Sequence, residues 1–336
     1  MENVANQLRE EAKKLLEAKK VDVIVGYEKG TLPLQSVPCF IEKPEDVHRL
    51  VWDAFCSQNL AKFAHDLIHQ HRASQVRVKP EERTKKVVGI VARGCTTRSI
   101  VLHLQERQYG RDEVVVLGVP CTGYVSKKKA AEAVGGEEIT GAEVKGKDLV
   151  LETPAGAKTV PLEAVLSESC LTCPFNNPVI SDITIGEPAP PMNAGGEYDK
   201  VDAFEKLPIE ERWAYFTKEM AKCIRCFACR NTCPSCYCKV CFAEQNQPAW
   251  IGVSVDPSDT QMFQLMRIFH MAGRCVDCGS CVEVCPMGVD LRTFLKKLDK
   301  DGFDLYNNRV GADMDSPPPL STFSNEDKEE FIYNPE

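Results

Sequence analysis

Residues 223–234 read CIRCFACRNTCP, and residues 275–286 read CVDCGSCVEVCP. Both stretches have the pattern Cys-x2-Cys-x2-Cys-x3-Cys-Pro. In this pattern three thiolates wrap one iron–sulfur cubane in a tight loop, and the fourth cysteine ligates the cubane of the other motif. We therefore predict two [4Fe–4S] clusters with crossed ligation. The expected sets are Cys223, Cys226, Cys229 and Cys285 for one cluster and Cys275, Cys278, Cys281 and Cys233 for the other. Four-thiolate zinc is the alternative, although zinc sites usually pair two Cys-x2-Cys units.

The bulk composition favours a reduced, cytoplasmic protein. The chain has 336 residues, enough for about two domains, and 17 cysteines, an odd number that argues against complete disulfide pairing. It contains no export signal and no apolar run long enough to span a membrane. A formal charge of −8 offers no basic surface for nucleic acid. Other redox proteins or small redox molecules are therefore the expected partners.

A helical pattern precedes each cysteine motif, from about residue 209 and over about 260–271. This arrangement resembles the α-helical ferredoxin of heterodisulfide reductase and of succinate dehydrogenase iron–sulfur subunits. The resemblance covers about residues 205–300 and implies two clusters spaced for electron tunnelling. Three further cysteines, Cys236, Cys238 and Cys241, follow the first motif in the segment CPSCYCKVC. They are either ligands of another cluster or small buried side chains beside the site.

The first half of the chain predicts an α/β (α+β) domain with a mixed sheet. Strands are expected in the β-branched runs, and an antiparallel excursion where short alternating segments are separated by glycine and proline. The expected elements are helices over 2–20 and 100–107, strands over 21–27, 87–92 and 113–119, and the excursion over 139–161. Glycine and proline then mark a linker over 186–204. We divide the chain into residues 1–185, that linker, an α-helical dicluster ferredoxin over 205–310, and a tail over 311–336, expected to be a disordered or partner-docking arm.

Four cysteines of the first domain form a candidate third site. Cys95 and Cys121 each follow a predicted strand, where open α/β sheets place their ligands, and Cys170 and Cys173 form a Cys-x2-Cys pair. These four are expected to bind a third [4Fe–4S] cluster. The alternative is that Cys95 and Cys121 only pack as buried thiols, which is the preferred interpretation for Cys39 and Cys56.

The segment from Cys170 to Gly186, with Cys-x2-Cys-Pro followed by Ser181, Asp182 and Ile183, resembles the β subunits of coenzyme F420-reducing hydrogenase and F420-linked formate dehydrogenase. The strand ending in Val119, Pro120 and Cys121 is similar to theirs, and the resemblance covers about residues 85–190. It implies a [4Fe–4S] cluster and FAD, although this chain lacks the family's N-terminal ferredoxin and its glycine-rich flavin-contacting segment.

The resemblances imply an electron-transfer subunit between a formate dehydrogenase or hydrogenase catalytic chain and heterodisulfide-reductase-like subunits of an anaerobe. The alternative is an FAD-dependent subunit that itself reduces or oxidises coenzyme F420 or another small acceptor. Two other features carry weaker signals. Lys127, Lys128 and Lys129 form either a phosphate or partner contact or a solvated face, and His65 and His69 lack the glutamate placement of a zinc protease helix.

Overall fold

A five-stranded mixed sheet organises the first half of the chain in the computed structural model, which describes residues 2–190, 192, 196–321 and 323. The strand order is β2-β1-β3-β4-β8, with β2 antiparallel to β1 and the other neighbours parallel. The strands are β1 (Val23–Lys29), β2 (Ser36–Ile41), β3 (Val88–Ala92), β4 (Val114–Gly118) and β8 (Ile183–Thr184). The predicted mixed sheet is confirmed. Strand β3 is central and fully buried, as its continuous apolar run requires.

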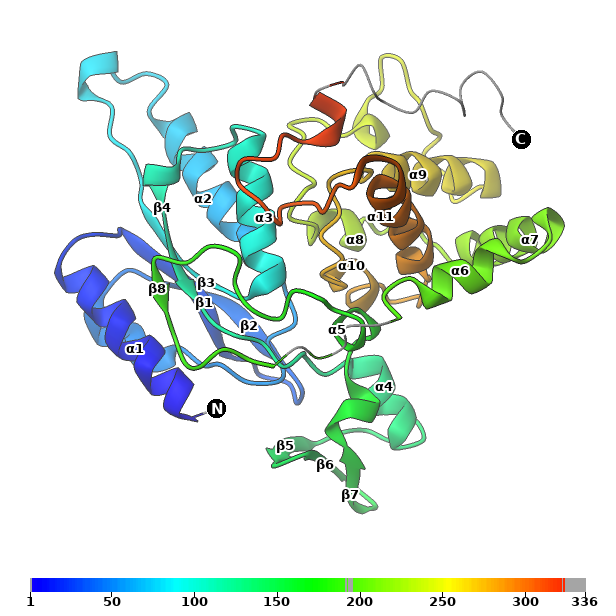
Figure 1. Ribbon diagram of the computed structural model, residues 1–336, viewed down its shortest axis with the longest axis horizontal. Coiled ribbons are helices and arrows are strands. Elements are labelled where there is room, and N and C mark those ends of the chain that lie inside the picture. The colour runs from blue at the N-terminus through cyan, green and yellow to red at the C-terminus, as the bar shows by residue number, and fades with distance from the viewer. Residues whose placement is uncertain (1, 191, 193–195, 322, 324–336) are drawn as a thin grey trace.

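Helices α1 (Glu2–Glu17), α2 (Ala61–Ser74) and α3 (Gly94–Gln105) pack around this sheet (Figure 1). The amphipathic pattern of the first helix is confirmed, because Leu8, Ala12 and Leu15 are buried and join the core of the sheet. The third helix begins earlier than the predicted residue 100, directly after β3. Its start therefore lies at the carboxyl edge of the parallel strands, where the candidate site was expected.

Between β4 and β8 the chain leaves the sheet and forms the predicted antiparallel excursion, which projects at the bottom of Figure 1. This segment has its own small core, which includes the buried Leu149 and Leu151. Its elements are α4 (Lys127–Ala133), β5 (Gly141–Lys145), β6 (Asp148–Thr153), β7 (Gly156–Pro161) and α5 (Glu168–Leu171). The last of these helices returns the chain to the edge of the main sheet with Cys170.

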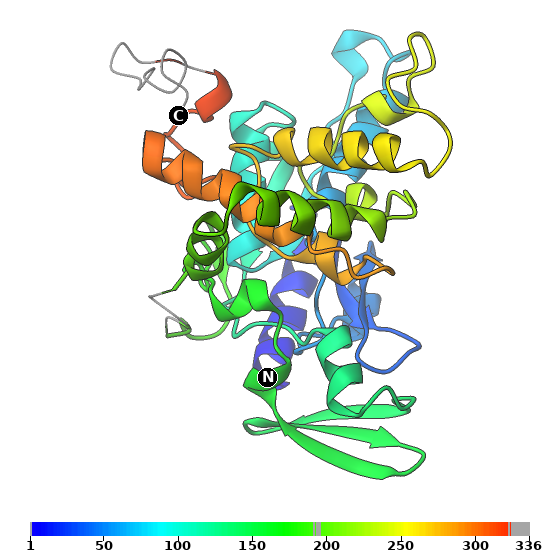
Figure 2. The same cartoon turned by 90° about the vertical axis from the view of Figure 1, so that its right-hand side faces the viewer.

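The second half is helical, as predicted, and α7, α9 and α11 lie side by side in Figure 2. Its helices are α6 (Asp199–Glu205), α7 (Ile209–Ala221), α8 (Ala228–Asn231), α9 (Pro257–Phe269), α10 (Ser280–Glu283) and α11 (Leu291–Tyr306). Phe216 and Met220 enter the core, whereas Trp213, expected on the same face, is exposed. No helix among the described residues is long and apolar enough to cross a membrane.

Two sequence-based expectations about irregular segments are corrected. The predicted linker over 186–204 is shorter, because α6 begins at Asp199 once the glycines and prolines end, and it buries Val201. The tail is not wholly an unpacked arm. Gln105 of α3 donates a hydrogen bond to the carbonyl of Asp313 at 2.8 Å, so this part of the tail lies against the first domain. Residues 322 and 324–336 of the predicted tail lie outside the described residues.

The two halves of the chain make direct contact through buried and half-buried charged side chains. Arg98 of α3 donates to the carbonyl of Val310 at 2.8 Å and to that of Val276 at 3.1 Å. Arg274 forms a two-bond ion pair with Glu106 at 2.8 and 2.9 Å. These contacts hold the second cysteine motif against the carboxyl edge of the sheet.

Candidate functional site: three cysteine-lined cavities

Three cavities of the structure are lined by cysteines, and each contains one of the sets of four expected from the sequence. The sheet-edge site has Cys95, Cys121, Cys170 and Cys173; the first crossed site has Cys223, Cys226, Cys229 and Cys285; the second crossed site has Cys233, Cys275, Cys278 and Cys281. The fourth cysteine of each motif thus lies with the first three of the other motif. Ligation of clusters by these sets remains a prediction.

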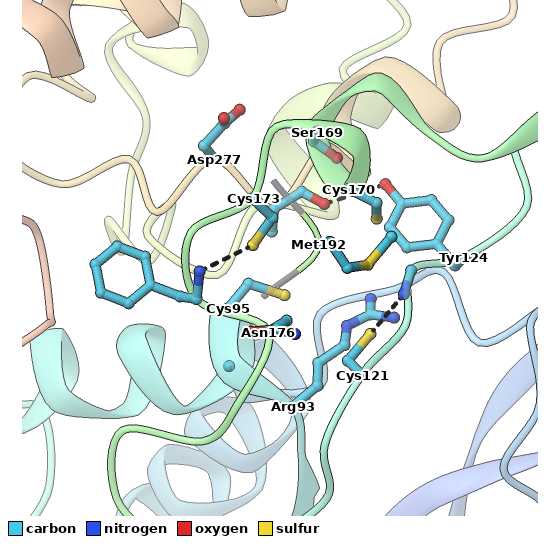
Figure 3. Close-up of a pocket in the computed structure, with 14 residues that line it drawn as sticks. Arg93, Cys95, Cys121, Tyr124, Ser169, Cys170, Cys173, Asn176, Met192 and Asp277 are labelled. Carbon is cyan, nitrogen blue, oxygen red and sulfur yellow. Dashed lines mark hydrogen bonds between the residues drawn. The ribbon is translucent and has the colours of Figure 1, made fainter. Parts of the chain in front are cut away.

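The sheet-edge site is built at the ends of two neighbouring parallel strands. Cys95 lies in the first turn of α3, directly after β3, and Cys121 follows β4. Cys170 on α5 and Cys173 in the next loop complete the set. In Figure 3 the four side chains border a common space, with Arg93 and Cys121 on one side. The long excursion between β4 and β8 therefore serves to bring a distant Cys-x2-Cys pair back to the sheet edge.

A glycine permits the close approach of these segments. A Cβ at Gly94 would overlap the backbone carbonyl of Phe175, so a larger residue would push the loop after Cys173 away from the start of α3. Two backbone amides are directed at the sulfurs. Gly123 N–H donates to Cys121 Sγ at 3.3 Å, and Phe175 N–H donates to Cys173 Sγ at 3.4 Å. Such donors stabilise thiolate sulfur and lower the electron density on a cluster.

Burial is the main influence on the protonation of these thiols. It raises the pKa of Cys173 to about 12 and also raises the pKa of Cys121, and neighbouring cysteines add to both effects. Several cysteine thiols crowded in a dry space therefore favour the neutral form in the absence of a cation. A coordinating metal deprotonates a thiol outright, so this environment suits thiols that carry their charge only as metal ligands.

The two crossed sites are built from loops of the same shape. After the first cysteine of each motif, the backbone enters the left-handed region at Arg225 (φ 49°) and at Asp277 (φ 52°). Each of these residues donates its amide to the preceding cysteine sulfur, Cys223 or Cys275, at 3.4 Å. The short helices α8 and α10 then follow at matching positions. The repeated spacing in the sequence thus corresponds to a repeated backbone geometry.

Neighbouring cavities are connected by shared lining residues or by a hydrogen bond. Asp277 and Cys278 line both the sheet-edge site and the second crossed site. Arg267, which lines the second crossed site, donates from Nη2 to the carbonyl of Cys229, a cysteine of the first crossed site, at 2.9 Å. The three sites therefore form a row in the order sheet-edge, second crossed, first crossed.

Two models of known families match separate parts of the chain. Residues 85–204 match the family model that describes the C terminus of the coenzyme F420 hydrogenase/dehydrogenase beta subunit. Residues 219–289 match the model of a 4Fe-4S dicluster domain. The chain thus joins a region that matches the C terminus of these beta subunits to a region that matches a 4Fe-4S dicluster domain. The dicluster domain supports the presence of [4Fe–4S] clusters, and its bounds include both cysteine motifs.

Several known proteins are similar to the whole chain or to part of it. The F420-dependent formate dehydrogenase subunit beta of Methanocaldococcus jannaschii is 22% identical, and the alignment spans 91% of each chain. Subunit beta of F420-dependent formate dehydrogenase 1 of Methanococcus maripaludis is 24% identical over 92% of this chain and 91% of its own. The succinate dehydrogenase iron–sulfur subunit of Bacillus subtilis is 29% identical over 35% of this chain and 48% of its own.

One solved structure, the F420-reducing [NiFe] hydrogenase complex from Methanosarcina barkeri, aligns with a TM-score of 0.37 and 17% identity. The alignment covers 52% of this chain and 63% of that chain. A TM-score this low carries no argument about the fold or the function.

Orphaned buried polar atoms test whether the cavities suit iron–sulfur clusters. Arg93, Arg225 and Arg267 line the sheet-edge, first crossed and second crossed sites respectively, and all three are buried. The Nε atom of each has no hydrogen-bond partner among the described residues. A buried donor without a partner indicates a group that occupies the adjacent space. Thiolate-bound cubanes are negatively charged and carry sulfur acceptors, so the three cavities fit such clusters. When bound, the clusters supply one-electron transfer.

Single-ion metal binding finds less support in the geometry. Within the part of the chain that the structure describes, no group of three or more His, Cys, Asp or Glu side chains converges closely enough to hold one metal ion. The cysteines of each set instead surround a space. In the dicluster domain Gln264 also donates from Nε2 to Cys223 Sγ at 3.1 Å, a contact that was not expected from the sequence.

The three cysteines that follow the first motif line a different space, which we call the lateral cavity. Cys236, Cys238 and Cys241 all border this cavity, which has a volume of about 750 Å³. They do not converge in the manner of a single-ion site. Cationic and aromatic side chains line the same cavity, among them Arg274 and Phe263. A further cluster held by these three cysteines remains a prediction.

Other residues considered in the sequence take structural positions. Cys39 and Cys56 are buried in the core of the sheet, away from the three cavities, as their packing interpretation predicted. His65 and His69 stack on each other at 4.1 Å between ring centres. Lys128 donates to the carbonyl of Val282 at 2.8 Å, so this lysine ties the excursion to the second cysteine motif and is not simply solvated.

Proposed function

We propose that the chain is an iron–sulfur electron-transfer subunit of an anaerobic oxidoreductase. It relays electrons between a catalytic chain of formate dehydrogenase or hydrogenase type and a heterodisulfide-reductase-like partner. The observation that carries the proposal is the row of three cysteine-lined cavities, in which the sheet-edge and second crossed sites share lining residues and Arg267 connects the second crossed site to the first. Adjacent clusters in such a row would exchange electrons without a domain movement or a diffusing carrier. The similarity to two formate dehydrogenase beta subunits over most of the chain supports the type of catalytic partner.

The two ends of the row differ in their access to solvent. Cys226 of the first crossed site is exposed, and the apolar side chains of Ile224 and Met287 beside it are 51% and 44% exposed. This end of the row suits electron exchange with another protein. At the other end, a cavity of about 310 Å³ shares Arg93 and Cys121 with the sheet-edge site.

Iron analysis of the anaerobically reconstituted chain tests the number of clusters. Three cubanes predict about twelve iron and twelve sulfide atoms per chain, from four of each per cubane. Cys121→Ser should lower the iron content to about eight by removing a ligand of the sheet-edge site. Cys39→Ala is the matched control, because this thiol is buried in the core of the sheet, and it should leave the iron content unchanged. Fewer than eight iron atoms in the intact wild-type protein would contradict the proposal.

Electron relay has its own test. Formate together with the catalytic chain of a formate dehydrogenase should bleach the visible absorbance of the cluster-loaded protein, because electrons enter through the partner. Formate alone should leave that absorbance unchanged. Bleaching by formate alone would show that the chain itself oxidises the substrate.

The second candidate function is an FAD-dependent subunit that reduces or oxidises coenzyme F420. The cavity of about 310 Å³ beside Cys121 supports it, since ligand pockets begin at about this size. FAD bound there would accept or donate two electrons with coenzyme F420 and pass them one at a time to or from the clusters. Acid release of flavin from the purified protein distinguishes the two candidates. Protein without flavin and without coenzyme F420 turnover would rule out the enzymatic candidate for the isolated chain.

A further inference from the structure

Each of the three cysteine-lined cavities is lined by a buried arginine that has no carboxylate partner among the described residues. Arg93, Arg225 and Arg267 are 2%, 8% and 3% exposed, and each lines a different one of the three sites. Among the residues that the structure describes, none of the three forms an ion pair with a carboxylate. The other polar contacts of Arg93 are to the backbone carbonyls of Cys56, Ser57 and Gln58.

Other buried cations near these sites behave differently. Arg292 also lines the second crossed site, but it donates to both carboxylate oxygens of Asp277 at 2.8 and 2.7 Å. Lys296 pairs with the same carboxylate at 3.3 Å. Although burial alone would raise it, these two cations hold the pKa of Asp277 below its usual range. Among the described residues, these two cations are thus paired with a carboxylate, whereas Arg93, Arg225 and Arg267 are not.

The two repeated loops of the dicluster domain differ in the residue that lies before the second cysteine of the motif. The first loop carries its cation at Arg225, one residue before Cys226. At the matching position the second loop has Asp277, whose charge is neutralised by neighbours of its own. The second crossed site takes its unpaired cation instead from Arg267 of α9. The unpaired guanidinium thus comes from the cysteine loop itself in the first crossed site and from α9 in the second crossed site.

Burying a guanidinium without a counter-charge is costly, so a negative charge in the adjacent cavity would stabilise it. A thiolate-ligated cluster is such a charge, and it gains one more negative charge on reduction. A fixed cation in contact with the cluster therefore stabilises the reduced form more than the oxidised form. Net charge and hydrogen bonds to the sulfurs are the terms by which proteins set cluster potentials.

We propose that Arg93, Arg225 and Arg267 are positioning residues that raise the reduction potentials of the sheet-edge, first crossed and second crossed clusters, respectively. The proposal rests on the presence of the three clusters in the proposed function. It adds the residue that shifts the potential of each cluster in the row.

Redox titration of the reconstituted protein, monitored by electron paramagnetic resonance, tests the assignment. Arg93→Gln, Arg225→Gln and Arg267→Gln should each shift the reduction equilibrium of a different cluster at least tenfold toward the oxidised form, about 59 mV for a one-electron couple. The signals are assigned by their loss in Cys121→Ser, Cys285→Ser and Cys275→Ser.

Two controls separate a charge effect from a structural one. Lysine at each of the three positions keeps the charge and should restore most of the wild-type potential. Arg72→Gln removes a cation that is paired with Glu113 at 2.5 Å and lines none of the three cavities, so all potentials should stay unchanged.

The outcomes distinguish this inference from the proposed function. Wild-type protein that binds no clusters would overturn the proposed function and with it this inference. Clusters that assemble normally but keep their potentials in all three glutamine variants would overturn the inference alone. It would also be overturned if the lysine variants shifted the potentials as far as the glutamine variants, or if glutamine caused loss of iron without any change in the remaining potentials.

Discussion

Gly279 provides a sharp test of how the sheet-edge site is held against the second crossed site. This glycine follows Cys278 and has a φ of 74°, in the left-handed region. A Cβ at this position would lie 2.6 Å from the hydroxyl of Tyr124 and would overlap Ser169 Oγ. Both of those side chains line the sheet-edge site. Gly279→Ala should therefore push the two sites apart.

The magnitude follows from a comparison with Gly288→Ala. Gly288 has a similar φ of 63°, but a Cβ there would meet no atom within 4 Å. Left-handed backbone costs a non-glycine residue about 1–2 kcal/mol in both variants. Only Gly279→Ala adds overpacking, about 1–3 kcal/mol. It also disturbs the hydrogen bond from Tyr124 to the carbonyl of Cys278 at 3.1 Å, worth about 1 kcal/mol. The free energy of unfolding should differ between the variants by about 2–4 kcal/mol.

Urea unfolding under anaerobic conditions, followed by the loss of cluster absorbance, measures this difference. Gly279→Ala should unfold at a clearly lower urea concentration than Gly288→Ala. Gly288→Ala should itself unfold below the wild-type protein, by the backbone strain of about 1–2 kcal/mol. Equal midpoints for the two variants would refute the packing argument, because the two substitutions share the backbone strain and differ only in the contacts of the added methyl group.

Two further predictions concern the contact between the domains. Burial lowers the pKa of His103 to about 3, so the folded protein keeps this ring neutral while the unfolded chain binds a proton as pH falls through 6.5. The free energy of unfolding should thus decrease on acidification. His103→Gln should reduce the fall of the urea midpoint between pH 7.5 and 5.5. Equal dependence of the midpoint on pH in the wild-type protein and the variant would contradict the assignment. A double-mutant cycle on Glu106→Gln and Arg274→Gln should give a coupling energy of about 1 kcal/mol for their two-bond ion pair, and a coupling near zero would show that the pair adds nothing.

The parts of the fold that follow local patterns were predictable from the sequence. Strands β1, β3 and β4 are short runs rich in β-branched residues and lie mostly buried in the sheet. Such runs are recognisable as buried strands without an alternating apolar and polar pattern. Strand β2 was missed because Pro38 interrupts it, and an edge strand tolerates such a residue. Helix α11 was also missed, although Asp290 caps it by accepting from the amide of Thr293 at 3.2 Å.

The candidate site was predictable to the extent that its residues occur in motifs. The spacing of the cysteines encodes the loops, and position at a strand end suggested that Cys95 and Cys121 lie together. Arg93 lies two residues before Cys95 and Arg225 lies inside the first motif, but the cysteine spacing itself assigns no role to either. Arg267 lies outside both motifs, and it reaches the second crossed site through the packing of α9, which no local spacing records.

The crossed arrangement of the two cysteine motifs determines when each set of four cysteines becomes complete during translation. The sheet-edge set is complete once Cys173 has been synthesised. Neither crossed set is complete at the end of the first motif, because the cavity of Cys223 also needs Cys285, the last cysteine of the chain. Cluster delivery to the nascent chain is therefore expected to have an order: the sheet-edge set is available during translation, and the crossed pair becomes available together only near its end.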